Sequence, residues 1–374
     1  MQVLELLFWI AVGLLAYTHI GYPLLIAALA RGRRRRPEAS PTGSPSVSLI
    51  IAAHDEEQVI AAKVANALAL DYPRELLEVI VASDGSDDAT AERAREAGAD
   101  LVLELPRAGK VPAQNAAVER AGGELLAFSD ANASWRPDAM RELIAPFGDA
   151  KVAYVCGQAR LLDQGGSNQE GVYWRYELAI RERESALGGV TAGNGAIYAV
   201  RASAYLPLGP AASHDLSFPF MLTKRGFRAL YAPAAIADEK MVATTEGEFE
   251  RKRRMMRGIF DEVVRDGMLW PRGYSAIYAF EIASHRGLRY ASPLLHLVAL
   301  ITNLALLDAS PVYAFTLAAQ LLLLLAAALA GAVPIRPLRI ARYYVLVTAS
   351  IAAGLWDRLR HGTPGAWEKA EGTR

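Results

Sequence analysis

Three long stretches of the chain carry no charged side chain. Residues 6–30, 291–307 and 309–335 contain no Asp, Glu, Lys or Arg. A transmembrane helix needs about 20 predominantly apolar residues, with a range of about 17–25, so each stretch is long enough to cross a bilayer. A fourth apolar stretch, 343–356, has only 14 residues, which is typical of a re-entrant or interfacial segment. The pattern therefore predicts three membrane-spanning helices.

Basic residues follow these stretches. Five arginines lie between positions 31 and 36, and Arg336, Arg339 and Arg342 follow the third stretch. Because Lys and Arg concentrate in cytoplasmic loops, this pattern places residue 31 onwards in the cytoplasm. A cleaved signal peptide would be shorter, and basic before its apolar core rather than after it. We expect a multi-pass protein of the cell membrane whose polar middle region is cytoplasmic and whose first partner is the lipid bilayer.

The polar middle region alternates short apolar runs with helix-like segments. The apolar runs lie at 47–53, 77–83, 101–105, 125–129, 152–157, 196–200 and 228–231. The helix-like segments lie near 59–69, 90–97, 113–121 and 216–224, and Pro137 opens another. Short apolar runs in this rhythm are typical of buried parallel strands joined by crossover helices. The predicted fold class is therefore α/β, with a Rossmann-like, mostly parallel sheet and additional transmembrane helices.

These patterns divide the chain into five parts. They are an N-terminal transmembrane helix with its basic flank (1–36), a linker rich in Pro, Ser and Gly (37–45), an α/β domain (46–266), an interfacial helix (267–290) and a C-terminal transmembrane or re-entrant region (291–374). The interfacial helix is predicted because aromatic and basic residues are mixed just before the second apolar stretch.

The composition argues against some classes of function. The chain has 40 basic and 40 acidic residues, so its formal net charge is zero and no strong single-sign field favours nucleic acid as a partner. Its single cysteine, Cys156, lies in an apolar run. An internal disulfide is therefore excluded, which fits a reducing compartment.

Acidic residues follow three of the predicted strands. His54-Asp55-Glu56-Glu57, Asp84 and Asp130 stand where the runs 47–53, 77–83 and 125–129 end. In open α/β sheets ligands bind outside the carboxyl ends of the strands, and crowded carboxylates require a cation or a donor-rich ligand. Asp130 and Asn132 project to the same side and can offer oxygens to one Mg²⁺ or Mn²⁺ ion. The alternative is a helix cap ahead of Pro137.

Other polar residues have both a structural and a functional interpretation. Asp84 belongs to an Asp-Gly turn or accepts a hydrogen bond from a nucleoside. Glu57 stabilises the first turn of the next helix or contacts the same ligand. Lys110 follows Gly109, and its charge suits a diphosphate, although the surrounding sequence is not a P-loop. Asp215 is a helix cap or a general base.

A dense basic cluster spans residues 251–257 and includes Arg251 and Arg254. One interpretation is a solvated or membrane-facing basic helix, since the membrane segments begin soon afterwards. The other is a clamp on a departing diphosphate.

Taken in order, these motifs resemble the membrane-bound family 2 glycosyltransferases, a group that includes bacterial chitin-, hyaluronan- and cellulose-synthase-like enzymes. The resemblance covers essentially the whole chain. The matching segments are Val47–Glu57, Ser83–Ser86, Gly109–Lys110 with Asn115, Phe128–Asn132, Gly193–Gly195, His214–Asp215, Arg251–Arg257, Ser284–Arg286, Leu288–Arg289 and Trp367–Lys369.

The resemblance implies a GT-A fold and inverting transfer of a sugar from a nucleotide-diphosphate sugar, such as a UDP-sugar, to a lipid or glycan acceptor. Such a reaction would serve cell-envelope or extracellular polysaccharide synthesis. By the same resemblance, the donor would be bound by Ala53, His54, Glu57, Asp84, Lys110, Arg251 and Arg254, the divalent metal by Asp130 and Asn132, and the acceptor hydroxyl would be activated by Asp215.

Three departures from the family pattern bear on these expectations. Asn132 replaces the second metal carboxylate, His214 stands where many members have another acid, and the Gln-x-x-Arg-Trp signature of processive synthases is absent. The last departure favours one or few transfers over processive polysaccharide synthesis, which is the alternative. A non-catalytic sugar-nucleotide-binding scaffold is a further alternative. A metal-dependent nucleotidyltransferase would share the α/β fold class, but Asp215 would have no role in it.

Overall fold

The computed structural model describes residues 1–32, 43–162, 169–240, 245–333 and 335–362. Arg33–Arg36, most of the predicted linker and the tail motif Trp367–Lys369 lie outside the described residues.

Within the described residues, an eight-stranded sheet forms the centre of the α/β domain, in the order β3-β2-β1-β4-β7-β6-β8-β5. The strands are β1 (Val47–Ala53), β2 (Leu77–Asp84), β3 (Leu101–Leu105), β4 (Leu125–Asp130), β5 (Ser134–Trp135), β6 (Val152–Leu162), β7 (Tyr198–Arg201) and β8 (Arg228–Lys240). The first four strands pair in parallel, and so do β6 and β8. In contrast, β7 runs antiparallel to β4 and β6, and β5 to β8. A parallel half is thus joined to a mixed half.

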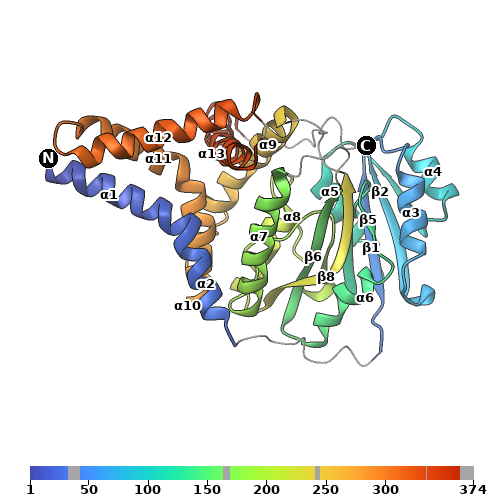
Figure 1. The fold of residues 1–374 in the computed structure, drawn as a ribbon. Helices are drawn as coiled ribbons and strands as arrows, with labels where there is room; N and C mark the ends of the chain where they lie inside the picture. The colour runs from blue at the N-terminus through green and yellow to red at the C-terminus, as the bar shows by residue number, and fades with distance from the viewer. Residues whose placement is uncertain (33–42, 163–168, 241–244, 334, 363–374) are drawn as a thin grey trace.

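Helices cover both faces of this sheet (Figure 1). Strand β1 is buried along its whole length, because its alternate side chains enter two separate cores. Helices α3 (Ile60–Leu68), α4 (Thr90–Glu96) and α6 (Ala139–Ile144) pack on one core, and α5 (Lys110–Val118) and α8 (His214–Lys224) on the other. Such two-faced burial explains why the parallel strands are continuous apolar runs. Short helical turns complete the domain: Arg74–Leu76, Ala145–Gly148 and Ala202–Ala204.

Long apolar helices lie to one side of the sheet. Helices α1 (Gln2–Ala16) and α2 (Tyr22–Ala30) are joined by a π-helical turn, Tyr17–Gly21, and α11 (Leu288–Ala305), α12 (Pro311–Leu329) and α13 (Arg336–His361) follow the α/β domain. Figure 1 shows α1, α11 and α12 stacked beside one another, and α1 and α12 both contact α11.

Three helices among the described residues are long and apolar enough to cross a membrane: Gln2–Ala30, Pro311–Leu329 and Arg336–His361. This set differs from the predicted one. The predicted span 291–307 falls in α11, which contains the polar buried residues Arg289, Ser292, Thr302 and Asn303 and is not among the three. The short stretch 343–356 lies inside the 26-residue helix α13, because helical structure continues through its charged flanks.

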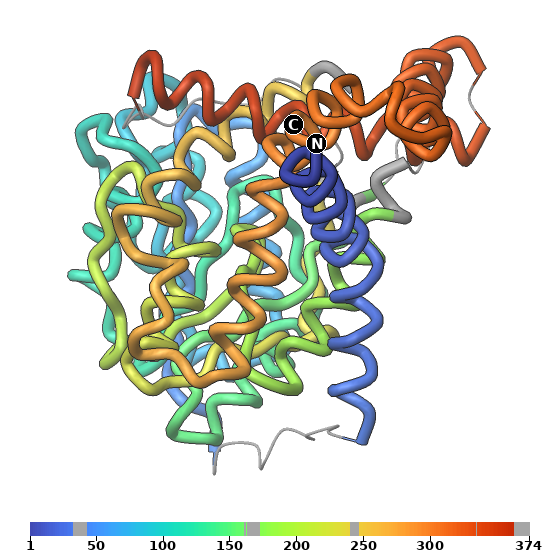
Figure 2. The backbone as a smooth tube through the Cα atoms, turned by 90° about the vertical axis from the view of Figure 1, so that its left-hand side faces the viewer, coloured from blue at the N-terminus to red at the C-terminus, as the bar shows by residue number. Residues whose placement is uncertain are grey.

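The remaining helices connect these two regions. They are α7 (Gln169–Ala186), α9 (Thr245–Val264) and α10 (Ala276–Glu281), which is followed by a π-helical turn, Ile282–Gly287. Helix α2 packs against α7, and α13 packs against α9. Figure 2 shows α13 running across the top of the α/β domain. The predicted interfacial helix 267–290 corresponds to α10, the π-helical turn and the first residues of α11.

Candidate active site

The three predicted acidic strand ends meet at one edge of the sheet. Strand β1 lies between β2 and β4, and the pairing aligns Ala53 with Ser83 and Ala52 with Asp130. Asp84 and Asp130 therefore end the strands on either side of Ala53. This is the carboxyl edge of the parallel half, where α/β proteins bind their ligands.

Asp84 holds the loop that leads into α5. It is buried, with 1% of its surface exposed. Its Oδ1 accepts hydrogen bonds from the backbone N–H groups of Ala108 and Gly109 at 2.7 and 3.0 Å, and Oδ2 accepts from Gly109 at 3.0 Å. Gly109 has φ 108°, a left-handed conformation that favours glycine. Asp84 thus fixes the backbone just before Lys110, and its contact with a donor nucleoside stays a prediction.

The other residues of this edge join neighbouring loops. The buried His54 ring donates from Nδ1 to the Asp84 carbonyl at 2.8 Å, and its Nε2 lies 3.3 Å from Asp55. Glu57 accepts a hydrogen bond from the Ala89 N–H at 3.3 Å. Ala53 is fully buried at the end of β1. His54 and Glu57 thus tie the loop after β1 to the loop after β2, and their predicted donor contacts remain predictions.

Lys110 and Asp130 form an ion pair across the carboxyl edge. Lys110 is the first residue of α5, and its Nζ donates to Asp130 Oδ1. Burial alone would lower the pKa of Lys110, but the charges of Asp130 and Asp215 raise it. A Cβ atom at Gly195 would lie 3.3 Å from both Lys110 Nζ and Asp130 Oδ2. The absence of a side chain at Gly195 therefore lets the backbone approach this pair closely.

The sequence analysis missed Glu239, which belongs to the same group of charges. Burial and the charge of Asp130 raise the pKa of Glu239 to about 7, while Arg251, Lys110 and Lys63 oppose the shift. The predicted strand ended at Tyr231, whereas β8 continues to Lys240. Asp84 and Asp130 were predicted because each is an acidic residue at the end of a strand. Glu239 would have been predicted in the same way if β8 had been predicted at its full length.

Lys63 of α3 binds the backbone directly after the Asp130–Asn132 segment. It is 3% exposed, its Nζ donates to the Ala133 carbonyl at 2.7 Å, and it lies 5.2 Å from the ring centre of Trp135. Burial lowers the pKa of Lys63 to about 7. Asn66 also holds Trp135, accepting from its N–H and donating to its carbonyl at 2.8 Å. Helix α3 therefore fixes the backbone that carries the predicted metal ligands.

The residues at this edge fit a hard divalent cation. Asp130, Asn132 and Glu239 offer oxygen donors, which Mg²⁺ and Mn²⁺ prefer. The Lys110 ammonium beside Asp130 shows that the position accepts positive charge. In the described parts of the chain, no group of three or more His, Cys, Asp or Glu side chains could hold a metal ion. Water or phosphate oxygens would therefore complete the coordination, as is usual for Mg²⁺.

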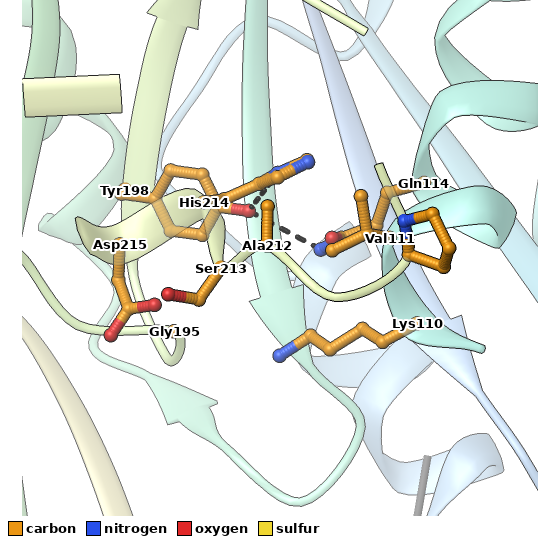
Figure 3. Close-up of a pocket in the computed structure, with 10 residues that line it drawn as sticks. Lys110, Val111, Gln114, Gly195, Tyr198, Ala212, Ser213, His214 and Asp215 are labelled. Atoms are coloured by element: carbon orange, nitrogen blue, oxygen red, sulfur yellow. Dashed lines mark hydrogen bonds between the residues drawn. The ribbon is translucent and has the colours of Figure 1, made fainter. Parts of the chain in front are cut away.

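A pocket of about 190 Å³ opens beside Lys110 and reaches Asp215. Helix α5 forms one wall, and the segment from Pro210 to Asp215 forms another (Figure 3). Figure 3 shows Lys110 and Asp215 entering from opposite sides. No described residue donates a hydrogen bond to the Asp215 carboxylate, so its oxygens are available to a ligand. The pocket thus brings together Lys110, which was predicted to lie near the diphosphate, and Asp215, which was predicted to be the general base.

His214 lines the same pocket in a structural position. It is 3% exposed, and its Nδ1 lies 2.8 Å from the Tyr198 hydroxyl, to which Gln114 donates at 3.2 Å. The ring packs edge-on against Phe128 and Phe218. Burial, assisted by the Lys110 charge, lowers the pKa of His214 to about 3. His214 is therefore neutral at physiological pH, and its ring anchors the segment that carries Asp215.

The basic cluster lies on α9, and its members have different partners. Arg251 forms a bidentate pair with Glu248 at 2.9 and 3.1 Å, and Lys252 lies 2.9 Å from the same carboxylate. Arg253 and Arg257 pair with Asp357 of α13. Arg254 is half-buried on the same helix. The effect of Arg251 on the pKa of Glu239 places its charge near Glu239, while the predicted diphosphate contacts of Arg251 and Arg254 stay predictions.

Residues 45–260 match the model of the family described as glycosyltransferase like family 2. The chain belongs to this family. Its sheet is therefore that of the GT-A fold, as the sequence motifs predicted.

Two relatives make different products according to their names. The poly-beta-1,6-N-acetyl-D-glucosamine synthase of Staphylococcus aureus is 25% identical over 244 residues, covering 62% of this chain and 59% of the relative. The beta-monoglucosyldiacylglycerol synthase of Trichormus variabilis is 29% identical over 280 residues, covering 68% and 58%. This chain thus spans less than two thirds of the length of either relative.

A solved structure shares the whole architecture of this glycosyltransferase. The mannosyltransferase of Pyrobaculum calidifontis, solved in complex with GDP-Man and Mn²⁺, superposes with a TM-score of 0.73 at 24% identity. The match covers 94% of this chain and 99% of the other. The similarity therefore includes the long apolar helices as well as the α/β domain.

Proposed function

We propose that this glycosyltransferase moves a sugar from a nucleotide-diphosphate sugar to a lipid or glycan acceptor at the cytoplasmic face of the membrane, with inversion at the anomeric carbon. The observation that carries this proposal is the pocket in which Lys110 faces Asp215. A cation next to the metal-binding edge and a carboxylate with available oxygens are what an in-line displacement of a diphosphate requires.

In the proposed reaction, Asp215 takes the proton from the acceptor hydroxyl while the hydroxyl oxygen attacks the anomeric carbon of the donor. The bond between that carbon and the diphosphate breaks, and the electron pair leaves with the diphosphate. Lys110 would stabilise the growing negative charge, and Arg251 and Arg254 would assist from α9. Asp130, Asn132 and Glu239 would hold a divalent cation, which supplies Lewis-acid stabilisation of the leaving group when bound.

The relatives support a nucleotide sugar as the donor and a divalent cation as the cofactor of the proposed reaction. The mannosyltransferase was solved with GDP-Man and Mn²⁺, and the Trichormus relative is named for a glycolipid product. The candidate membrane helices would bring a lipid acceptor to the protein. The Staphylococcus relative is named for a polysaccharide, which favours processive synthesis as the second candidate. The missing Gln-x-x-Arg-Trp signature weighs against that candidate.

The test uses the full chain in lipid vesicles with Mn²⁺ and a panel of radiolabelled UDP- and GDP-sugars. Label in the solvent-extractable lipid fraction supports transfer to a lipid, whereas label in a polymer longer than a few sugars would establish processive synthesis. Asp215→Asn is expected to lower turnover by about 10²–10⁴-fold, which is the usual contribution of a general base. Asp71→Asn, a change at an exposed surface aspartate, is the matched control. Donor binding without turnover in the unmodified chain would contradict the enzymatic proposal.

A further inference from the structure

The C-terminal half of α13 is docked closely on α9. Gly354 stands at the contact: a Cβ atom added there would lie 2.6 Å from Met256 Cβ and 2.7 Å from the Arg253 carbonyl oxygen. Both distances are shorter than any real carbon contact allows. Only glycine at this position lets the two helices approach so closely.

Two sets of ion pairs secure this contact along one face of α9. Asp357 is 3% exposed and accepts from Arg253 Nε and Nη2 at 2.6 and 2.8 Å, and from Arg257 Nη2 at 3.2 Å. The next residue, Arg358, donates from Nε and Nη2 to Asp261 at 2.9 and 2.7 Å. Bidentate pairs of this kind fix orientation as well as distance. Consecutive residues of α13 therefore set both the position and the rotation of α9.

The residue after Asp261 connects α9 to the pocket. Glu262 is 1% exposed, and its Oε1 accepts from the Ser213 backbone N–H at 2.6 Å and from the Ser213 hydroxyl at 2.9 Å. Ser213 is the residue from which α8 begins, two positions before Asp215. Glu262 Oε2 has no hydrogen-bond partner among the described residues.

The protonation state of Glu262 agrees with a role in fixing the position of Ser213. Burial, assisted by the charges of Asp215 and Asp266, raises the pKa of Glu262 to about 8. At neutral pH the side chain is therefore mostly an uncharged hydrogen-bonding group. It fixes Ser213 without adding a second full negative charge beside Asp215.

We propose that Glu262 is a positioning residue for Asp215, and that the docking of α13 on α9 sets where Glu262 stands. This inference rests on the proposed function, since it assigns a role through Asp215. It also assigns two members of the basic cluster, Arg253 and Arg257, to the contact with α13.

The first test compares Glu262→Ala and Glu262→Gln in the full chain in lipid vesicles. Alanine leaves both Ser213 donors without their acceptor, so kcat is expected to fall about tenfold or more, because small displacements of catalytic groups are costly. The donor KM should change less than about twofold, since the donor edge is untouched. Glutamine keeps an acceptor oxygen and should recover most of the lost kcat. Nucleotide binding and thermal unfolding show whether each variant folds.

The second test disrupts the contact between α13 and α9 at a distance from the pocket. Arg358→Glu repels Asp261 and is expected to reproduce the kcat loss of Glu262→Ala, while the charge swap of Arg358→Glu with Asp261→Arg should restore much of it. Arg360→Glu is the matched control, because Arg360 lies in the same turn of α13 and stacks on Trp356 instead of pairing with α9.

The outcomes separate the two proposals. If Asp215→Asn is inactive while Glu262→Ala and Arg358→Glu keep the parent kcat, the positioning role is overturned and the proposed function stands. A KM increase without a change in kcat, or no rescue by Gln and by the charge swap in folded variants, also overturns it. If Asp215→Asn remains active, the base assignment itself fails.

Discussion

The two halves of the site are built in different ways. On the donor side, Asp84 and Asp130 have partners within their own half: two backbone N–H groups for Asp84 and the Lys110 ammonium for Asp130. On the acceptor side, no described residue donates a hydrogen bond to the Asp215 carboxylate, and the segment that carries it is held by α9 through Glu262. The donor half is locally self-sufficient. The acceptor half depends on α9 and, through it, on α13, which is one of the candidate membrane-spanning helices.

The largest effect is expected from removing the central carboxylate of the donor half. Asp130→Ala should lower sugar transfer by about 10³-fold, because both the cation and Lys110 lose their anchor. Binding of Mn²⁺, measured by electron paramagnetic resonance, should be lost in the same variant. Asp138→Ala, at an exposed position in the same loop region, is the control. Unchanged Mn²⁺ binding in Asp130→Ala would remove this residue from the metal site.

A smaller effect is expected at Asp84, which supports the donor edge indirectly. Asp84→Ala leaves the N–H groups of Ala108 and Gly109 without their acceptor, and an unsatisfied buried donor such as the Gly109 N–H costs about 1–3 kcal/mol. Lys110 then loses its fixed starting point, so the donor KM should rise more than kcat falls. Steady-state kinetics with the best donor measures both. A fall in kcat alone would show that Asp84 serves the acceptor half instead.

Gly354→Ala tests whether the acceptor half depends on α13. The added methyl group meets backbone and side-chain atoms of α9, and overpacking of this kind costs about 1–3 kcal/mol. The kcat should fall while the donor dissociation constant stays the same. Gly13→Ala on α1 is the control, because nothing lies within 4 Å of a Cβ atom there. Equal kinetics in the two variants would show that the halves are independent.

The last prediction concerns the pH dependence of stability rather than turnover. The pKa of Glu262 is about 8 in the folded protein, against an ordinary value of 4.5. Above pH 4.5 the unfolded chain ionises this carboxyl group, whereas the folded chain must keep it protonated. Its contribution to stability is therefore complete below pH 4.5 and is lost as the pH rises towards 8. The melting temperature of Glu262→Gln should thus rise relative to the parent between pH 5 and pH 8. A constant difference would mean that Glu262 is ionised in the folded state.

The parts of the fold that the sequence predicted are those governed by local pattern. The strands β1, β2 and β4 are continuous apolar runs because both their faces are buried, and their acidic ends followed directly from those runs. Strand β8 was underestimated because Pro233 and the alanines around it resemble a loop. Its partners β6 and β5 come from distant parts of the chain, and such pairing has no local signature.

The candidate site residues also divide into those that a local sequence pattern predicts and those that only a tertiary contact reveals. Asp130, Lys110 and Asp215 were predictable because each stands beside an element boundary that the pattern shows. Glu262 was not, because it lies within a polar helix and matters only through its contact with Ser213. The length of helix α13 was underestimated because the uncharged stretch ends at Trp356. In the structure, Asp357 and Arg358 continue the helix, because α9 provides each with a partner.

The ion pair between Lys110 and Asp130 has a consequence for how the reactants assemble. Each group neutralises the other, so a cation that binds Asp130 must compete with the Lys110 ammonium. A diphosphate that draws Lys110 away removes this competition. Thermodynamic linkage then requires each ligand to raise the affinity for the other by the same factor. The donor and its cation should accordingly bind cooperatively, and neither alone should bind as tightly as it does in the presence of the other.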